Sequence, residues 1–370
     1  MAGRYRLHSR ISDGGMSSVW LGKDQLLGRD VAVKQVISLE GMPEADAEAV
    51  RGKALHEGRV ASKLAHRHAI AVYDVILDRG TPWLVMEYMP SRNVAQILHV
   101  TEHLDPIDAA QIGAQVASAA ADAHEAGVIH RDIKPGNILI ANTGRDAGLV
   151  KLTDFGIAQF KDEDDDGDLI SGTPAYFAPE VARGAAPSEA SDVYSLGSTI
   201  YTMVEGVPPF GMSEDVGALL DSVARARIRP PEQAGPLHDV LLSMLTPSPA
   251  KRPTMAQVRD ELAVIAARAT RSTPEHVLTG RISRPDGAPP VWALATPTAP
   301  RMRTGAFPRS YVPAPAPSAV APATAPRRAP APAPATTGVA ASTSNERRWL
   351  IIAGVVALIA VLVIVLAVAL

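Results

Sequence analysis

The segment HRDIKPGNILI, residues 130–140, gathers charged and amide side chains immediately before an apolar run. Its polar members are too hydrophilic for a packed core, so the segment is either a solvated turn or a reactive loop. These members are Arg131, Asp132, Lys134 and Asn137. A carboxylate can accept a proton, an amide oxygen can bind a metal ion and an ammonium group can hold a phosphate. The rest of the chain decides between the two interpretations.

The composition excludes several classes of function. The chain has 370 residues, with 36 Lys and Arg against 39 Asp and Glu, and only 4% aromatic residues. A near-neutral chain with so few stacking groups is not expected to bind nucleic acid. The absence of cysteine excludes disulfides, a thiolate nucleophile and cysteine-ligated zinc. The N-terminal MAGRYRLHSR lacks the apolar stretch of a signal peptide.

The elements that must position the reactive loop follow from residue patterns. Residues 31–37 (VAVKQVI) and 82–89 (PWLVMEYM) are rich in β-branched and aromatic residues and predict strands. Residues 109–127 and 191–206 keep apolar or alanine positions at helical spacing and predict helices. Strands come early and helices late. This order predicts an α+β fold, in which a small strand-rich lobe precedes a helical lobe and a ligand binds between them.

The last part of the chain has a different composition. From about residue 269 to 346 it is dominated by Pro, Ala, Thr and Arg, which predicts a disordered linker. Residues 349–370 are uncharged and would form a helix about 33 Å long, enough to cross a bilayer. A buried core helix is the alternative. Arg347 and Arg348 flank this segment, so the positive-inside rule predicts a single-pass protein of the cell membrane with residues before 347 in the cytoplasm.

The segments ISDGGMSSVW, VAVK, HRDIKPGN, DFG and APE occur in this order along the chain. Over about residues 4–268 the chain resembles a bacterial eukaryotic-type (Hanks-type) Ser/Thr protein kinase. The resemblance implies a bilobal catalytic domain at 1–268, with an N-lobe at about 1–89 and a C-lobe at about 90–268. It also implies ATP and Mg²⁺ as cofactors, with Mn²⁺ as the alternative ion.

The resemblance gives the reactive loop its roles. Asp132 would accept or steer the proton of a substrate hydroxyl, and Lys134 would steady the transferred phosphate. Asn137 would bind the metal ion together with Asp154 of DFG. On its own, Asn137 would be interpreted as a turn residue, but its fixed distance from Asp132 favours the metal-binding role. The residues expected at the nucleotide are Ser12, Gly14, Val19, Ala32, Lys34, Glu57, Glu87, Met89 and Asp154.

The partner of Lys34 and the sequence of the nucleotide loop need separate comment. Lys34 would hold the α and β phosphates, and Glu57 would orient it, although the same segment offers other glutamates upstream. The nucleotide loop departs from the family pattern of three glycines, because it has Ser12, Gly14 and Ser17 at those places. Serine at the first place restricts the backbone where it would approach a phosphate.

The resemblance also implies contacts at the adenine edge. Met86 would close the back of the adenine pocket. The backbone carbonyl of Glu87 and the backbone N–H of Met89 would bind the adenine, so their side chains carry no chemistry in this interpretation.

Other residues of the family pattern are expected to support the fold. Asp192 would brace the catalytic loop, and Arg252 would form a buried ion pair with Glu180. His130 is interpreted as a core histidine that supports the loop. Arg131 would receive negative charge from the later activation segment.

That segment, FKDEDDDGDLISGTP, has acidic residues from 162 to 168 where similar kinases often carry phosphorylated threonines. Their carboxylates could replace phosphate on Arg131. The alternative is a solvated acidic loop with Ser171 or Thr173 as the switch.

The expected function is phosphorylation of Ser and Thr in cytoplasmic proteins, including the chain itself, and the alternative is a membrane-anchored pseudokinase scaffold. The span ends the chain, so we expect no extracellular sensor domain. Phosphothreonines in the linker could recruit forkhead-associated-domain proteins. The candidate linker sites are Thr273, Thr279, Thr296, Thr298 and Thr304.

Overall fold

The structure is a computed structural model that describes residues 1–13, 18–36, 43–155, 173–213 and 215–294. Gly14, the acidic residues 162–168 and the expected membrane span 349–370 lie outside these residues. Within the described ranges, no helix combines the length and apolar character that crossing a membrane requires.

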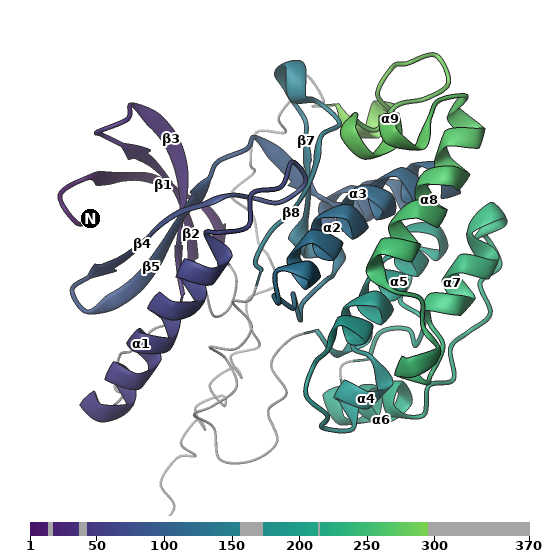
Figure 1. Ribbon diagram of the computed structural model, residues 1–370, viewed down its shortest axis with the longest axis horizontal. Coiled ribbons are helices and arrows are strands. Elements are labelled where there is room, and N and C mark those ends of the chain that lie inside the picture. Colours follow the sequence, from purple (N-terminus) through teal and green to yellow (C-terminus); the bar gives the residue numbers. More distant parts are fainter. Residues whose placement is uncertain (14–17, 37–42, 156–172, 214, 295–370) are drawn as a thin grey trace, which may run out of the picture. The chain divides into compact units, whose positions relative to one another are not determined.

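A five-stranded antiparallel sheet forms the first part of the domain (Figure 1). Its strands, in spatial order, are β1 (Tyr5–Asp13), β2 (Ser18–Asp24), β3 (Arg29–Gln35), β5 (Thr81–Glu87) and β4 (Val72–Asp78). The strands predicted at 31–37 and 82–89 correspond to β3 and β5.

The alternation of side chains along β3 decides which of them can reach a ligand. Val31 and Val33 pack into an apolar cluster on one face of the sheet, whereas Ala32 packs into the cluster on the other face. Because successive side chains of a strand point to opposite faces, Lys34 shares the face of Ala32. Helix α1 (Glu44–Ala61) packs on this sheet, and a Cβ at Gly58 would collide with Val75 of β4.

The second part of the domain is mainly helical and contains a small sheet in the order β6-β7-β8. The strands are β6 (Ser91–Asn93), β7 (Ile138–Ala141) and β8 (Val150–Leu152). The helices are α2 (Val94–Thr101), α3 (Pro106–Glu125), α4 (Pro179–Ala182), α5 (Glu189–Glu205), α6 (Val216–Ala224), α7 (His238–Met244), α8 (Met255–Thr270) and α9 (Pro274–Thr279).

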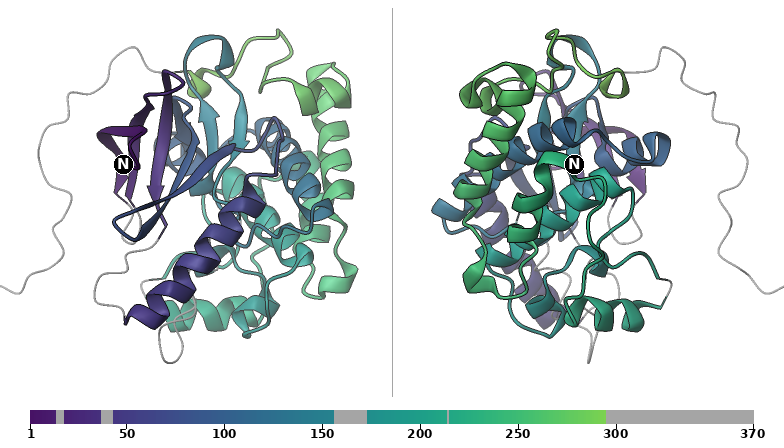
Figure 2. Two further views of the ribbon diagram at one scale, coloured as in Figure 1. Left: turned by 60° about the vertical axis from the view of Figure 1, so that its left-hand side comes forward. Right: turned by 90° about the vertical axis from the view of Figure 1, so that its right-hand side faces the viewer.

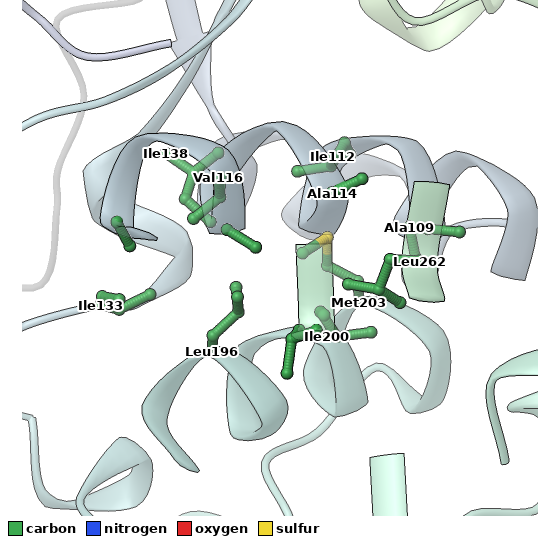
Figure 3. Packing of buried hydrophobic residues seen from close by; sticks show 14 of the residues in the cluster. Ala109, Ile112, Ala114, Val116, Ile133, Ile138, Leu196, Ile200, Met203 and Leu262 are labelled. Atoms are coloured by element: carbon green, nitrogen blue, oxygen red, sulfur yellow. The ribbon is translucent and has the colours of Figure 1, made fainter. Parts of the chain in front are cut away.

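Helix α3 forms the centre of the helical core. Its alanines allow α5 and α8 to approach closely, and side chains such as Ile112, Ile200 and Leu262 interdigitate there (Figure 3). Asp105 caps the start of α3 by accepting from the N–H of Ile107. The helices predicted at 109–127 and 191–206 correspond to α3 and α5.

The prediction that a disordered linker begins at about residue 269 is wrong. Helix α8 continues to Thr270, and residues 273–294 fold back on the helical lobe instead of forming a disordered chain (Figure 2). Gln115 of α3 donates from Nε2 to the carbonyl of Val277 at 2.7 Å, and the amide of Gln111 bonds with the backbone of Ser283. Three apolar side chains of this segment are at most 3% exposed: Val277, Ile282 and Ala293. We call residues 273–294 the C-terminal strap.

Candidate active site

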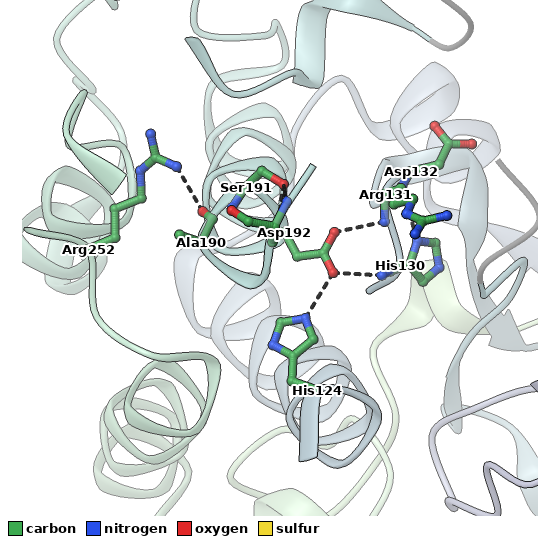
Figure 4. A network of polar contacts seen from close by, with 9 residues as sticks. His124, His130, Arg131, Asp132, Ala190, Ser191, Asp192 and Arg252 are labelled. Atoms are coloured by element: carbon green, nitrogen blue, oxygen red, sulfur yellow. Dashed lines mark hydrogen bonds and ion pairs between the residues drawn. The ribbon is translucent and has the colours of Figure 1, made fainter. Parts of the chain in front are cut away.

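The reactive loop lies between α3 and β7 and is held by one buried carboxylate. Asp192, near the start of α5, accepts hydrogen bonds from the backbone N–H groups of His130 and Arg131 at 2.7 and 2.8 Å. It also lies 2.9 Å from Nε2 of His124 (Figure 4). Arg131 has a φ of 71°, in the left-handed region that residues other than glycine seldom adopt. The expected bracing role of Asp192 is confirmed, because its bonds maintain this unusual conformation.

His130 joins this loop to the segment that follows β8. Its Nδ1 accepts from the N–H of Asp132 at 3.2 Å, so the proton resides on Nε2, which donates to the carbonyl of Thr153 at 2.8 Å. The ring of His130 also packs edge to face on the ring of Phe155, with 4.7 Å between the ring centroids. Fully buried, His130 is therefore the supporting core histidine that the sequence predicted.

The three predicted catalytic residues meet on one carboxylate oxygen. Oδ2 of Asp132 lies 2.8 Å from Nζ of Lys134 and 3.0 Å from Nδ2 of Asn137. Nδ2 of Asn137 also donates to the backbone carbonyl of Asp132 at 2.8 Å. The carboxylate of Asp132 is therefore fixed in place, with a cation beside it.

A second constellation joins the two sheets. Nζ of Lys34, on β3, lies 2.6 Å from Oδ2 of Asp154, which directly follows the end of β8 and Thr153. Asp154 has a φ of 71°, a conformation that persists only when its surroundings require it. Glu57 lies on α1, but its side chain is outside the described residues, so its predicted contact with Lys34 stays a prediction.

Lys34 and Asp154 line a cavity of about 280 Å³. Its lining includes the apolar side chains of Val19 and Ala32, together with Met86, Glu87 and Met89. Of the predicted site residues, the cavity is lined by Ser12, Val19, Ala32, Lys34, Glu87, Met89, Asn137 and Asp154. Gly14 lies outside the described residues. Polar groups that the sequence analysis missed also line the cavity, namely Ser91, Asn93, Gln96 and Thr153.

A largely buried ion pair at the cavity was also missed. Nζ of Lys151 lies 3.0 Å from Oε2 of Glu87 and donates to the carbonyl of Ala69 at 3.0 Å. The N–H of Ala71 donates to the same oxygen of Glu87. A lysine inside the apolar strand β8 was the signal that could have revealed this pair, because a buried cation needs a partner.

The donor set fits a magnesium ion. The amide nitrogen of Asn137 is engaged by Asp132, so Oδ1 is the atom of this side chain that can bind a cation. Asp154 contributes a carboxylate at the same cavity. Mg²⁺ uses one or two such protein oxygens and completes its shell with water and phosphate oxygens. Asn137 and Asp154 would hold the ion here.

The ion pair predicted to support the fold is present. The guanidinium of Arg252 donates to both carboxylate oxygens of Glu180, at 2.6 and 2.7 Å. It also donates to the backbone carbonyls of Thr246, Ala190 and Pro247, and its side chain is fully buried. This pair ties α4, which follows the activation segment, to the segment before α8.

Comparisons with known proteins agree with this geometry. A model of the protein kinase domain matches residues 5–262. The chain is 32% identical over 299 residues to the probable serine/threonine-protein kinase PknB of Corynebacterium glutamicum, covering 76% of this chain and 44% of that protein. It is 33% identical over 270 residues to the serine/threonine-protein kinase pkn3 of Myxococcus xanthus, covering 70% of this chain and 49% of that protein.

A further relative is matched over more of its length. The chain is 36% identical over 313 residues to the serine/threonine-protein kinase PknA of Mycobacterium tuberculosis, covering 81% of this chain and 67% of that protein. The chain spans about half the length of several other curated relatives that it matches. The order of the motifs, the fixed carboxylate of Asp132 and the match to the family model agree. This chain belongs to the protein kinase domain family.

Proposed function

We propose that this chain is an ATP-dependent serine/threonine protein kinase that phosphorylates cytoplasmic proteins and itself. One observation carries the proposal: Asp132 is held by Lys134 and Asn137 in the loop whose Asn137 lines the cavity where Lys34 meets Asp154. The names of the relatives support Ser and Thr as the acceptors, as does Lys134, which resembles the lysine of Ser/Thr kinases.

When bound, Mg-ATP supplies the phosphoryl group and a metal ion that neutralises charge on the phosphates. Asp132 orients the substrate hydroxyl and takes its proton at the carboxylate. Lys134, next to that carboxylate, stabilises negative charge on the transferred group. Lys34, near the end of β3, holds the phosphates. Val19 and Ala32 exclude water from the adenine. Rate then comes from alignment and charge neutralisation.

The alternative is a pseudokinase scaffold, which would keep the fold without transferring phosphate. The residues that phosphoryl transfer needs are all retained: Lys34, Asp132, Asn137 and Asp154. A scaffold gains nothing from a carboxylate held between a lysine and an amide, so the enzyme is the better-supported function.

The test uses the full-length chain, Mg-ATP with a labelled γ-phosphate and a generic acceptor protein. We expect label on Ser and Thr, and Asp132→Asn should reduce the rate by about 10²–10⁴, the usual contribution of a general base. Asp146→Asn is the matched control, because Asp146 is an exposed carboxylate in the turn after β7. Transfer by the wild type no greater than by Asp132→Asn would reject the enzyme.

In this proposal the kinase domain is cytoplasmic and the chain is anchored in the cell membrane through residues 349–370. Support comes from the uncharged sequence of that segment and from Arg347 and Arg348 before it. Fractionation of cells that express the full chain tests the anchor: we expect kinase in the membrane fraction, released by removal of residues 349–370. Full-length kinase recovered in the soluble fraction would contradict it.

Linker threonines are proposed as autophosphorylation sites that recruit forkhead-associated-domain proteins. Thr273 and Thr279 are poor candidates, because Oγ1 of Thr273 accepts from the N–H of His276 and Oγ1 of Thr279 donates to the backbone carbonyl of Glu275. The proposal therefore rests on Thr296, Thr298 and Thr304, which lie outside the described residues. Mass spectrometry of active protein that finds these three unmodified would remove it.

A further inference from the structure

His68 is the residue through which the C-terminal strap reaches strand β8. It lies in the loop between α1 and β4, and it is fully buried. Its Nδ1 lies 2.8 Å from the backbone carbonyl oxygen of Val150, in β8. Its Nε2 lies 2.6 Å from the backbone carbonyl oxygen of Leu278, in the last turn of α9. The imidazole is thus a direct bridge between the strap and β8.

The two partners of His68 set a requirement on its charge. Carbonyl oxygens accept hydrogen bonds and cannot donate them. A neutral imidazole has one N–H, so it can satisfy one of the two carbonyls while the other faces a nitrogen lone pair. An imidazolium has an N–H on both nitrogens. Both bonds of the bridge therefore form together only when His68 is protonated.

The bridge acts on the strand that leads to Asp154. In the order β6-β7-β8, β8 has an open edge, and the loop around His68 pairs with that edge. The N–H of Leu152 donates to the carbonyl of His68 at 2.8 Å, and the N–H of Ile70 donates to the carbonyl of Leu152 at 2.9 Å. Asp154 follows β8 immediately after Thr153. A displacement of β8 is therefore passed on to the expected metal-binding carboxylate.

The surroundings of His68 determine when it is protonated. Burial lowers the pKa of His68, while its two carbonyl partners raise it. His66, whose ring centroid is 5.7 Å away, and Arg67 lower it further. Other titratable groups lie on the elements around it: Lys151 on β8; Glu275, His276, Arg281, Arg284 and Asp286 in the strap; and Asp108, Asp122, His124 and Glu125 on α3. Because the net direction is downward, the second bond forms only at a pH below the ordinary histidine pKa.

We propose that His68 is a proton-dependent positioning residue for Asp154, which joins the strap to β8 through both carbonyls as an imidazolium and through one carbonyl as a neutral ring. Its effect on phosphoryl transfer rests on the proposed kinase function. The bridge itself is a property of the fold and can be measured without activity.

The first experiment measures amide hydrogen exchange in the full-length protein at about pH 5.5 and about pH 8, on either side of the ordinary histidine range. Rates are corrected for the intrinsic pH dependence of exchange. We expect amides of the strap, such as that of Ile282, which donates to Gly148, to be better protected at the lower pH. The gain should be about 2- to 10-fold, equivalent to one hydrogen bond. His68→Gln should abolish this pH response.

His66→Gln is the matched control. His66 lies in the same loop and is partly buried. Its Nδ1 accepts from the backbone N–H of His68, and its Nε2 faces Ser118 and Asp122 on α3 instead of the strap. This variant should keep a pH response of the strap, with its midpoint at higher pH because His66 no longer lowers the pKa of His68. Equal protection at both pH values in the wild type, or an unchanged response in His68→Gln, overturns the bridge. If His68→Gln does not fold, NMR of the wild-type ring nitrogens decides: two protonated nitrogens at the lower pH support the bridge, and one overturns it.

The second experiment measures steady-state kinetics of the same proteins. Because Asp154 is expected to bind the metal of Mg-ATP, we expect His68→Gln to raise KM for Mg-ATP about 2- to 10-fold at the lower pH, with a smaller change in kcat. His66→Gln should leave KM for Mg-ATP unchanged at the lower pH. Altered strap protection with an unchanged KM would remove the positioning role. A wild type that transfers no phosphate would instead reject the kinase function, and the exchange data would still decide the bridge.

Discussion

Nζ of Lys34 and Oδ2 of Asp154 form an ion pair at 2.6 Å, although Lys34 lies near the end of β3 in the first sheet and Asp154 follows β8, the last strand of the second. Their side chains are 8% and 20% exposed, so the pair is largely shielded from water. The contact connects the part of the cavity that would hold the phosphates with the part that would hold the metal ion.

Replacing Lys34 by Met should therefore reduce kcat/KM for Mg-ATP by about 10²–10³, as for loss of one preorganised charge at a reacting group. Lys34→Arg should recover little, because the planar guanidinium does not replace a compact ammonium group. Initial rates over a range of Mg-ATP concentrations measure this effect. Lys23→Met is the control, since Lys23 pairs with Asp30 on an exposed part of the same sheet. Equal losses in both variants would contradict the assignment.

Replacing Asp192 by Asn should disturb the reactive loop without touching the cavity. Asp192 accepts from two backbone N–H groups and contacts His124, and the amide of Asn cannot accept at both of its ends. Each buried donor left unsatisfied costs about 1–3 kcal/mol. We expect a lower free energy of unfolding in urea and slower phosphoryl transfer. Wild-type stability in this variant would show that the network does not hold the loop.

The buried ion pair of Arg252 gives a prediction about stability alone. Arg252→Met leaves the carboxylate of Glu180 without its cation and should cost about 3–5 kcal/mol. Glu180→Gln should cost less, because its amide oxygen still accepts from the guanidinium. Denaturant unfolding provides the measurement. Arg259→Met is the control, because the Arg259–Asp260 pair is more exposed and a surface pair contributes about 0–1 kcal/mol. The prediction fails if Arg252→Met and Arg259→Met are equally stable.

Asp108 of α3 gives a prediction about pH. Burial raises the pKa of Asp108, so the folded state holds its ionised form less well than the unfolded state does. This penalty is absent below the ordinary carboxyl pKa of about 4 and grows as the pH rises through the folded-state pKa. Asp108→Asn should therefore stabilise the protein at neutral pH, with the gain vanishing in acid.

The substitution keeps the hydrogen bond at this position, because the new amide oxygen can still accept from Nε1 of Trp292, as the carboxylate of Asp108 does at 2.9 Å. Thermal unfolding of both proteins between about pH 4 and about pH 7 checks the expectation. Asp122→Asn, which removes a more exposed carboxylate from the same helix, is the comparison variant. A constant difference across the range would exclude ionisation of Asp108 as the cause.

The acidic residues of the activation segment remain a prediction from the sequence. If their carboxylates replace phosphate on Arg131, changing Asp164, Asp165 and Asp166 to Asn should lower the initial rate of phosphatase-treated protein. High salt should lower the rate of the parent more mildly, because it screens the same contacts. Unchanged rates in the variant would leave Ser171 or Thr173 as the switch.

Features that span only a few residues could be predicted from residue patterns. Asp132, Lys134 and Asn137 lie within one short loop, so their spacing along the chain already placed them together. The composition of β3 identified a strand, and the alternation of its side chains assigns Lys34 to the face of Ala32. These features depend on backbone geometry over a few residues, which a sequence pattern records directly.

Contacts between distant segments depend instead on how the folded elements pack. Lys34 meets Asp154 and Lys151 meets Glu87 because strands from separate sheets approach one another, and no local pattern reports that approach. The strap is the clearest case: its composition predicted disorder, yet Val277 and Ile282 are buried in the core of the helical lobe. Composition measures how much apolar surface a segment has, whereas folding of that segment depends on whether the rest of the chain supplies a surface to bury it.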